Sequence, residues 1–600
     1  MKPRHGMRWV ILALTLPVFI IELGCESGDG GGDGEAPGPY ECGDQPLCGA
    51  DRYSGDRPDD AIHVNACCPV DDPDGSLDKP YATINAALDA VQPGDTVAVA
   101  AGTYDPVEIS KRVSLLGAGA DRCALVPSSG DAAAMEITGV QQVAVSGLML
   151  SGTVDALASP CSPPACMDRQ ALTIPAGVGL VVSEAEDVTI SNVVVREFEH
   201  VGDWTGIGIL VTESTGVSLQ DIAVSANAKA GIVYSGSTGE IAGAWLHHNG
   251  SGAAAAALAI MDNSAVMVGS DAIPLESAGS FAAGGCLVED NDAIGVFVHD
   301  SSISFYGSKI RGNLHGGAAF DTAAPDNAAS VIRNNFFEGN ASFGISLVNY
   351  TADVISNRFG GTTDCDGDCV GHCVNVAGDD PTDWPQVAIE DNLISDCAGA
   401  GILLDGPVIA TVDGNSIDNA LRWGGIWVQG GVDVVSLTSN TIDAAALVGI
   451  AVTTNSRAQI INNTVNDTWE ETFYQFDTDS YVDMADGIVI SQVTDTAGVL
   501  LEANSISNSG RAGIIIDAAS TEQVIFASEP ELRNKVSGSG EAEIVLQNGA
   551  EPIAEAQDLV ENVVGLSDLT DIVTDQVFSI VQSMTTAVLS SPCVPPACMD

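Results

Sequence analysis

Short apolar strands recur along the chain at a nearly constant interval. Between residues 399 and 452 a Gly-Ile pair opens such a strand three times, at Gly401-Ile402, Gly425-Ile426 and Gly449-Ile450, so each repeat is 24 residues long. A polar turn with an asparagine separates the strands, at Asn415 and again at Asn440. A fixed period in the twenties, with short strands and no helix between them, is typical of a solenoid, in which each coil packs only on its neighbours.

The same pattern extends over most of the chain. Further strands begin in the same way at Gly208, Gly231, Gly295, Gly317, Gly344, Gly487 and Gly513. The last strand of this kind begins at Glu543-Ile544, without the glycine. Positions +1 and +3 from the glycine are aliphatic and should point into the coil, because side chains alternate along a strand. Position +2 should face outward, yet it is often apolar, and we call these residues the outer stripe: Leu210, Val233, Phe297, Leu403, Trp427, Val489 and Ile515. We expect another segment to cover the outer stripe, or the stripe to bind a partner.

Asparagine recurs in the turns between strands. The positions are Asn192, Asn291, Asn313, Asn335, Asn357, Asn392, Asn415, Asn440, Asn463, Asn504 and Asn534. Asparagine tolerates the left-handed backbone of a sharp corner, and stacked asparagine side chains can hydrogen-bond from coil to coil. We expect both features at the corners of the coils.

Two amphipathic segments frame the repeats. Apolar residues from Ile84 to Val91 follow helical spacing after Thr83, a favourable N-cap residue. Near the end of the chain the same spacing connects Leu569, Ile572, Val573, Val577, Ile580, Val581, Met584 and Val588. We therefore predict an N-terminal capping helix and a C-terminal amphipathic helix, the second of which caps the last coil or lies on the outer stripe.

The first of these segments carries a family resemblance. The run from Asp74 to Tyr104, DGS…KPYATINAALDAVQPGDTVAVAAGTY, resembles the N-terminal cap of right-handed parallel β-helix proteins, the pectin-lyase-like superfamily. The resemblance implies an all-β chain that forms one right-handed parallel β-helix solenoid. We expect the cap and first coils over residues 41–125, further coils over 126–550 with loops at 362–385 and 467–485, and the helix with a Cys-Pro tail over 551–600. No reaction is implied, because that superfamily includes lyases, hydrolases and adhesins.

The first 40 residues indicate export. Residues 1–25 combine a basic start with the apolar run Trp9–Ile21 and resemble a bacterial lipoprotein signal, in which Cys25 is lipidated. The match departs from the family at Glu22, where leucine is preferred, and the alternative is an ordinary signal peptide with Cys25 in a disulfide. The Gly/Asp-rich residues 26–40 predict a flexible tether. We therefore expect an exported protein at the bacterial cell envelope or outer surface, with membrane contact only through the lipid anchor.

The net charge limits which partners the protein can bind, and the cysteines indicate the cellular compartment. The chain has 21 Lys and Arg against 81 Asp and Glu, a net charge of −60, which repels nucleic acid and also polyuronates unless cations bridge them.

Of its 15 cysteines, an even number remains once Cys25 is set aside, and in an exported chain this predicts disulfides. The candidates are Cys161, Cys166, Cys365, Cys369, Cys373, Cys397, Cys593 and Cys598. The segments SPCSPPACMD at 159–168 and SPCVPPACMD at 591–600 predict two disulfide-pinned turns, with a repeated recognition tag as the alternative.

The densest polar cluster is TTDCDGDCVGHC, residues 362–373. Its alternating Asp364, Asp366 and Asp368 suit calcium, although the glycine does not stand where an EF-hand loop requires it. Cys365, Cys369 and Cys373 with His372 would also imitate a zinc site, but this spacing in an exported chain favours disulfides, with Cys397 as fourth partner. Calcium is thus the one cofactor with a candidate site, and none is required.

Candidate catalytic carboxylates stand at strand ends. Asp300, Asp321 and Asp405 fall on one expected edge of the coils, where neighbouring carboxylates can act as acid and base in glycoside hydrolysis. A solvated edge of a very acidic protein is the simpler interpretation. The ordered Asn-Thr-Asp, Asp-Asp, Gly-His-Gly and Arg-x-Lys elements of pectinolytic hydrolases of this fold are not found as a set. Aromatic residues in the two loops, Trp384, Trp469, Tyr474 and Tyr481, can stack on sugars or pin the loops.

Three functions are compatible with these features. The favoured one is a surface-anchored acidic β-helix with a binding or structural role, in contact with a polysaccharide or an envelope protein. The alternative is an extracellular polysaccharide lyase or glycoside hydrolase with a divergent site. The third is side-by-side assembly of copies through Leu403 and Trp427 of the outer stripe.

Overall fold

The computed structural model divides the chain into two units, Met1–Gln45 and Pro46–Asp600, and all described residues belong to the second. It describes residues 50–547 and 560–561, except 56, 69, 128–132, 154–176, 200–205, 252–254, 272–283, 324–329, 364–370, 381–383, 433–434, 455, 470, 476–479, 492, 494–497, 518–523 and 527–531. The predicted signal, tether and C-terminal helix lie outside these residues. No described helix has the length and apolar character of a membrane span.

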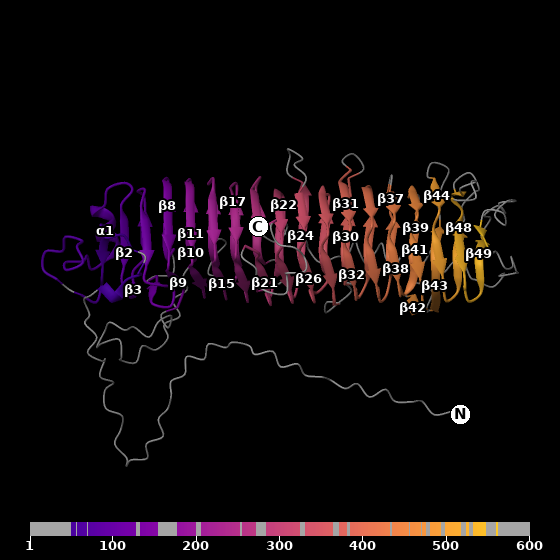
Figure 1. Ribbon diagram of the computed structural model, residues 1–600, viewed down its shortest axis with the longest axis horizontal. Helices are drawn as coiled ribbons and strands as arrows, with labels where there is room; N and C mark the ends of the chain where they lie inside the picture. Colours follow the sequence, from indigo (N-terminus) through magenta and orange to yellow (C-terminus); the bar gives the residue numbers. More distant parts are fainter. Residues whose placement is uncertain are drawn as a thin grey trace, which may run out of the picture. The chain divides into compact units, whose positions relative to one another are not determined.

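Each coil contributes one strand to each of three parallel sheets, which we call C, A and B in the order in which a coil visits them (Figure 1). One coil runs through β33 (Ala400–Asp405), β34 (Ile409–Asp413) and β35 (Ser416–Asp418). The next runs through β36 (Gly424–Gln429), β37 (Val435–Thr438) and β38 (Thr441–Asp443), and each strand pairs in parallel with its counterpart. The predicted parallel β-helix is therefore confirmed.

The other strands of sheet C are β4 (Val107–Ile109), β7 (Met135–Thr138), β10 (Val178–Ser183), β13 (Ile207–Thr212), β16 (Ala230–Ser235), β19 (Ala256–Met261), β22 (Ile294–Tyr306), β24 (Ala318–Ala323), β27 (Phe343–Val348), β30 (His372–Ala377), β39 (Leu447–Thr453), β43 (Ser480–Ser491), β46 (Ala512–Asp517) and β49 (Ala542–Gln547). Those of sheet B include β15 (Ala223–Ser225), β18 (Trp245–His247), β21 (Leu287–Glu289), β23 (Lys309–Arg311), β26 (Phe336–Glu338), β29 (Arg358–Gly360), β32 (Leu393–Ser395), β41 (Thr464–Asn466), β45 (Ser505–Ser507), β48 (Asn534–Ser537) and β50 (Val560–Glu561). The long strand β22 passes from sheet C into sheet A.

The repeated glycine is required because the coil leaves no room for a side chain at that position. A methyl group built on Gly425 would lie 2.6 Å from the carbonyl oxygen of Gly449 and 2.6 Å from Cγ2 of Ile442. Gly401 meets the same two obstacles one coil earlier, at Gly425 and Ile417. A side chain at this position would clash with the next coil and with a side chain of sheet B, so only glycine fits there.

The predicted inward positions form the core. Ile402, Leu404, Ile426 and Val428 are buried in one continuous apolar cluster that runs from Val64 to Ile544. A cluster without interruption from coil to coil is what a solenoid needs, because one coil alone cannot bury its apolar face.

Asparagine side chains form two ladders at the corners of the coils. At the corner between sheets B and C the ladder contains Asn227, Asn249, Asn291, Asn313 and Asn340. At the corner between sheets A and B it contains Asn335, Asn357, Asn392, Asn415, Asn440, Asn463, Asn504 and Asn534. The predicted coil-to-coil hydrogen bonds are confirmed for the ladder members. Asn192 belongs to neither ladder and has the predicted left-handed backbone, with a φ of 51°.

The predicted backbone at these ladder residues is wrong. The left-handed residue is the one before the ladder asparagine, for example Asp290, Asn334, Ser356 and Asp391. The left-handed residue turns the chain so that the side chain of the following asparagine points inward. There its amide forms hydrogen bonds with backbone groups that have no backbone partner in the turn.

The N-terminal helix is present as α1 (Ile84–Ala90), whose N-cap Thr83 accepts a hydrogen bond from the backbone N–H of Ala86 over 3.2 Å. Its buried residues Ile84, Ala87 and Leu88 join the core. The strands β2 (Thr96–Val99), β3 (Gly102–Tyr104) and β5 (Ser114–Gly117) follow the helix. That α1 shields the open end of the stack stays a prediction.

Candidate functional site

Two of the three predicted carboxylates meet at a histidine on the outer face of sheet C. His299 of β22 pairs in register with Asp321 of β24, and its Nδ1 lies 3.3 Å from Asp321 Oδ2. Its Nε2 lies 3.5 Å from Oδ2 of Asp300, the next residue. The Phe297 ring stacks parallel to the imidazole at 6.2 Å. A histidine whose two ring nitrogens each face a carboxylate is an arrangement that recurs in general acid–base catalysis.

Asp405 stands apart from this pair. The strand register leads from Asp321 through Val348 and Ala377 to Asp405, three strand spacings or about 14 Å. Burial raises the pKa of Asp405 to about 6, an effect that the Gln429 side chain and the N–H of Gly406 partly offset. The three carboxylates therefore do not form one constellation.

A buried histidine lies at the start of β30 in sheet C, five residues before the Ala377 position that pairs with Asp405. His372 of β30 accepts a hydrogen bond at Nδ1 from the backbone N–H of Ala400 over 3.0 Å, and burial lowers its pKa to about 4. Its ring meets Trp423 edge-on at 4.9 Å, and Trp423 meets Trp427 at 6.4 Å. This histidine is neutral and packed, which is the behaviour of a structural residue.

The predicted cation loop cannot be assessed, because Asp364, Asp366, Asp368, Cys365 and Cys369 lie outside the described residues. His372 and Cys373 are described, and Cys373 is bonded to Cys397 with a sequence separation of 24, so that predicted disulfide is present. Within the described ranges no three His, Cys, Asp or Glu residues are placed to hold a metal ion.

The other cysteines divide into three groups. Cys67 and Cys68 are disulfide-bonded. Cys123 and Cys286, which are not among the predicted disulfide candidates, are free and buried. Each thiol is enclosed by the coil interior, where it behaves as a small apolar side chain. The remaining candidates, Cys25, Cys161, Cys166, Cys593 and Cys598, lie outside the described residues.

The predicted stacking aromatics are not gathered into one platform. Trp384 is half-buried, whereas Trp469 is 36% exposed and donates from Nε1 to the carbonyl of Ala444 over 3.1 Å. Tyr474 and Tyr481 pair across the antiparallel hairpin of β42 (Glu471–Gln475) and β43, and their side chains lie outside the description. The Trp469 contact fits the role of pinning a loop.

An aromatic and basic surface that the sequence did not predict lies on the outer face of sheet B. The first residues of six successive strands stack in register, and we call them the B-face ladder: Trp245, Leu287, Lys309, Phe336, Arg358 and Leu393. Lys309 Nζ lies 4.8 Å from the centre of the Phe336 ring, and the Arg358 guanidinium lies 5.3 Å from it. At one strand spacing per residue the ladder extends about 24 Å.

Ion pairs and hydrogen bonds connect the third residues of the same strands, which form the neighbouring column of this face, to each other and to the B-face ladder. Arg311 donates from Nε to Glu289 Oε2 over 2.6 Å, and Trp245 donates from Nε1 to Glu289 Oε1 over 2.9 Å. Lys309 pairs with Glu338 at 3.0 Å. Trp245 is 41% exposed and stacks on His247 at 4.1 Å, and burial followed by repulsion from His248 lowers the pKa of His247.

Arg358 differs from these cations. It is exposed, and among the described residues its guanidinium has only the Phe336 ring as a partner, without a carboxylate. Guanidinium has five N–H donors in a planar fork that matches a carboxylate. In a chain with 81 acidic residues, an exposed arginine without an acidic partner is available to an external anion.

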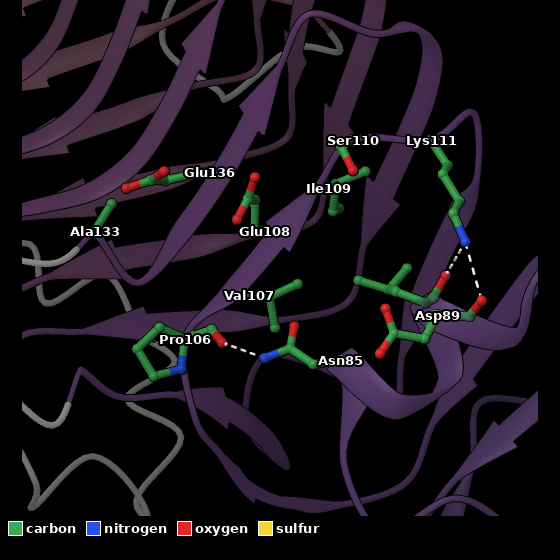
Figure 2. Close-up of a pocket in the computed structure, with 11 residues that line it drawn as sticks. Asn85, Asp89, Pro106, Val107, Glu108, Ile109, Ser110, Lys111, Ala133 and Glu136 are labelled. Atoms are coloured by element: carbon green, nitrogen blue, oxygen red, sulfur yellow. Dashed lines mark hydrogen bonds between the residues drawn. The ribbon is translucent and has the colours of Figure 1, made fainter.

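A separate hollow of about 440 Å³ lies beside α1 (Figure 2). Glu108 and Glu136 occupy paired positions on β4 and β7 along its wall. Lys111 donates from Nζ to the carbonyls of Leu88 and Asp89, and Asn85 donates to the carbonyl of Pro106. The Lys111 and Asn85 side chains thus bind backbone carbonyls of the helix and of the neighbouring strand.

A model of the right-handed β-helix region matches residues 177–359, 271–419 and 368–528, which together cover more than half of the chain. The chain belongs to the right-handed β-helix family. No curated protein matches the sequence. This family assignment confirms the handedness implied by the N-terminal resemblance.

Solved structures match the chain at low similarity. The A-module of a mannuronan C-5 epimerase from Azotobacter vinelandii is 17% identical, with a TM-score of 0.38 over 63% of this chain and 92% of that one. A periplasmic alginate epimerase is 12% identical, with a TM-score of 0.32 over 78% of this chain and 82% of that one. The catalytic domain of an α-1,3-glucanase is 11% identical, with a TM-score of 0.30 over 86% and 69%. Similarity of this degree carries no argument about the activity of the β-helix described here.

Proposed function

We propose that this β-helix protein binds an acidic polysaccharide along the B-face ladder. The observation that carries the proposal is Arg358, exposed beside Phe336 and without an acidic partner among the described residues. A uronate carboxylate matches its guanidinium, and the apolar faces of sugar rings match the exposed surfaces of Trp245 and Leu393.

The shape and local charge of the ladder favour a linear polymer. Six stacked side chains form a strip parallel to the stack of coils, so successive units of an extended chain can contact successive strands. Along this strip and the adjoining column, Lys309, Arg311 and Arg358 stand against Glu289 and Glu338. Cations therefore outnumber carboxylates locally, whereas the whole chain has a net charge of −60 and repels polyanions elsewhere.

The proposed location is outside the cytoplasm, with a lipid anchor at Cys25. The Cys373–Cys397 disulfide and the disulfide-bonded Cys67 and Cys68 support an oxidising compartment. The lipoprotein-like start and the tether at 26–40 would hold the coils at the cell envelope, where a polysaccharide is within reach.

The test compares two variants that remove one positive charge from the same column of sheet B. Arg358→Gln lies in the ladder, and Lys535→Gln lies on β48, outside the ladder. We expect Arg358→Gln to weaken binding of a uronate hexasaccharide about 10- to 100-fold, the usual worth of a hydrogen-bonded ion pair. Lys535→Gln should change the affinity less than about twofold, because a distant exposed charge is screened. Equal affinity of the two variants would refute the proposed site, and binding only with added calcium would move it to residues 362–373.

A second candidate function rests on His299. The placement of its two ring nitrogens beside Asp300 and Asp321 suits proton transfer to a bound sugar. If polymer turnover occurs, His299→Gln should abolish it and leave binding to the B-face ladder unchanged. Turnover that survives His299→Gln would exclude this residue.

A further inference from the structure

Two neighbouring histidines lie at the corner between sheets B and C, beside the first member of the B-face ladder. His247 is the last residue of β18, and His248 follows it with a left-handed backbone, at a φ of 55°. Side chains of consecutive residues in a regular strand point to opposite faces, but a left-handed residue breaks this alternation. The two rings therefore meet, and their Nδ1 atoms lie 2.8 Å apart.

The separation of the two Nδ1 atoms is close to that of two neighbouring ligands on one metal ion. Imidazole nitrogens bind Zn²⁺ at about 2.0–2.1 Å, so two nitrogens at right angles around an ion of this size are about 2.9 Å apart. In the chain alone, one ring donates its Nδ1–H to the Nδ1 lone pair of the other. When an ion takes both lone pairs, the donating ring carries its proton at Nε2 instead, so the pair needs no change of charge to bind it.

We infer that His247 and His248 form a two-nitrogen site for a divalent transition-metal ion, with Cu²⁺ bound more tightly than Ni²⁺ or Zn²⁺. Among the residues that the structure describes, no third His, Cys, Asp or Glu completes the site, so water or an external ligand fills the remaining positions. Cu²⁺ and Ni²⁺ suit such a site because they accept mixed nitrogen and oxygen ligands in tetragonal arrangements. This inference does not depend on the proposed function.

The surroundings of His247 hold its ring in place and keep its nitrogens neutral. The Trp245 ring stacks on it at 4.1 Å, with an angle of 29° between the two planes. Burial, followed by repulsion from His248, lowers the pKa of His247, so its ring is neutral at pH 7. His248 is exposed and His247 is half-buried, so an ion can reach the pair from solvent.

Nearby carboxylates favour a cation at this corner. His247 pairs in register with Glu289 on β21, and the backbone N–H of His248 donates to the carbonyl of Asp290 over 3.2 Å. The charges of Glu289 and Asp290 both favour the protonated form of His247. The same attraction acts on a metal ion at the pair without either carboxylate being a ligand.

The experiment titrates Cu²⁺ into the whole chain at pH 7 and follows calorimetry and tryptophan fluorescence together. Excess Ca²⁺ is present throughout, because it prefers oxygen ligands and occupies carboxylate sites. We expect one tightly bound Cu²⁺ per chain and quenching of Trp245, whose ring stacks on a proposed ligand. His247→Gln and His248→Asn should each weaken binding at least about tenfold, because two linked donors bind more tightly than one. Asparagine at position 248 tolerates the left-handed backbone, so this variant retains the corner.

The matched control is His315→Gln, which removes a half-buried histidine that pairs with Asp292 at 3.5 Å. It should leave the affinity and the quenching unchanged, whereas Trp245→Phe should retain the affinity and lose the quenching. Hyperfine structure in the electron paramagnetic resonance spectrum should show two nitrogens in the unaltered chain and fewer in either ligand variant. Equal affinity of His247→Gln and His315→Gln, displacement of Cu²⁺ by Ca²⁺, or the lack of saturable binding would each overturn the inference.

Discussion

The asparagine ladder between sheets A and B offers the sharpest test of what holds the coils together, and Asn415 is one of its well-connected members. Its side chain donates to Asn440 Oδ1 over 3.0 Å, to the carbonyl of Ile389 over 2.8 Å and to the carbonyl of Asp413 over 3.2 Å. Its Oδ1 accepts from the backbone N–H of Asn392 over 3.0 Å and from Asn392 Nδ2 over 2.9 Å. The residue is fully buried, so water cannot replace a lost partner.

Asn415→Ala removes five hydrogen bonds and leaves the N–H of Asn392 without its acceptor. At about 1 kcal/mol for each hydrogen bond, we expect the free energy of unfolding to fall by about 5 kcal/mol or more, because the buried N–H without an acceptor adds a further cost. The matched control is Gln459→Ala, which removes an exposed amide two coils along and should cost less than about 0.5 kcal/mol.

Guanidinium unfolding followed by circular dichroism measures the loss, and hydrogen exchange locates it. Since a solenoid is stabilised coil by coil, exchange should accelerate most at Asn392 and Asn440 and less at the distant Asn227 ladder. A variant as stable as Gln459→Ala, or uniform acceleration along the chain, would refute the view that the ladder stabilises adjacent coils locally.

Three further predictions concern the coils. Gly425→Ala should destabilise the protein by about 2 kcal/mol or more in the same unfolding assay, because its methyl group would lie 2.6 Å from Gly449 O, whereas Gly498→Ala meets no atom within 4 Å and should be neutral. Replacing Cys373 and Cys397 by serine should cost about 3 kcal/mol for a loop of 24 residues, and an unchanged unfolding midpoint would contradict this estimate. Because the pKa of Asp405 is raised to about 6, the folded state binds its proton more tightly than the unfolded state, so this residue favours folding increasingly as pH falls from 7 towards 4. Asp405→Asn should therefore be more stable than the unaltered chain by on the order of 2 kcal/mol at pH 7, with the difference vanishing near pH 4; a difference independent of pH would exclude Asp405 as its source.

Much of the fold could be predicted because some residues recur at a regular interval in the sequence. Gly401, Gly425 and Gly449 recur because each coil passes the same obstacle, and Ile402 and Leu404 point inward by simple alternation. The ladder asparagines were visible for the same reason. Their backbone was predicted wrongly, because the sequence does not say which of two adjacent corner residues takes the left-handed conformation.

The B-face ladder was missed because loops of unequal length separate its members. Trp245 and Leu287 are 42 residues apart, whereas Lys309 and Phe336 are 27 apart, yet each pair is in register on adjacent strands. Only the strand register shows that Lys309, Phe336 and Arg358 are neighbours. Asp300, Asp321 and Asp405 occupy similar places in their repeats, so the sequence suggested that they lie together. The strand register separates them, because Asp405 follows Asp321 by three coils.

The central claim is that the B-face ladder binds an acidic polysaccharide. The most direct measurement incubates the purified protein with acidic and neutral polysaccharides, with and without calcium, and follows retention, unsaturated products and new reducing ends together. We expect retention of carboxylated polymers that weakens with salt and needs no calcium. Failure to retain any carboxylated polymer would contradict the account, whereas products released by the unaltered chain but not by His299→Gln would support the second candidate function.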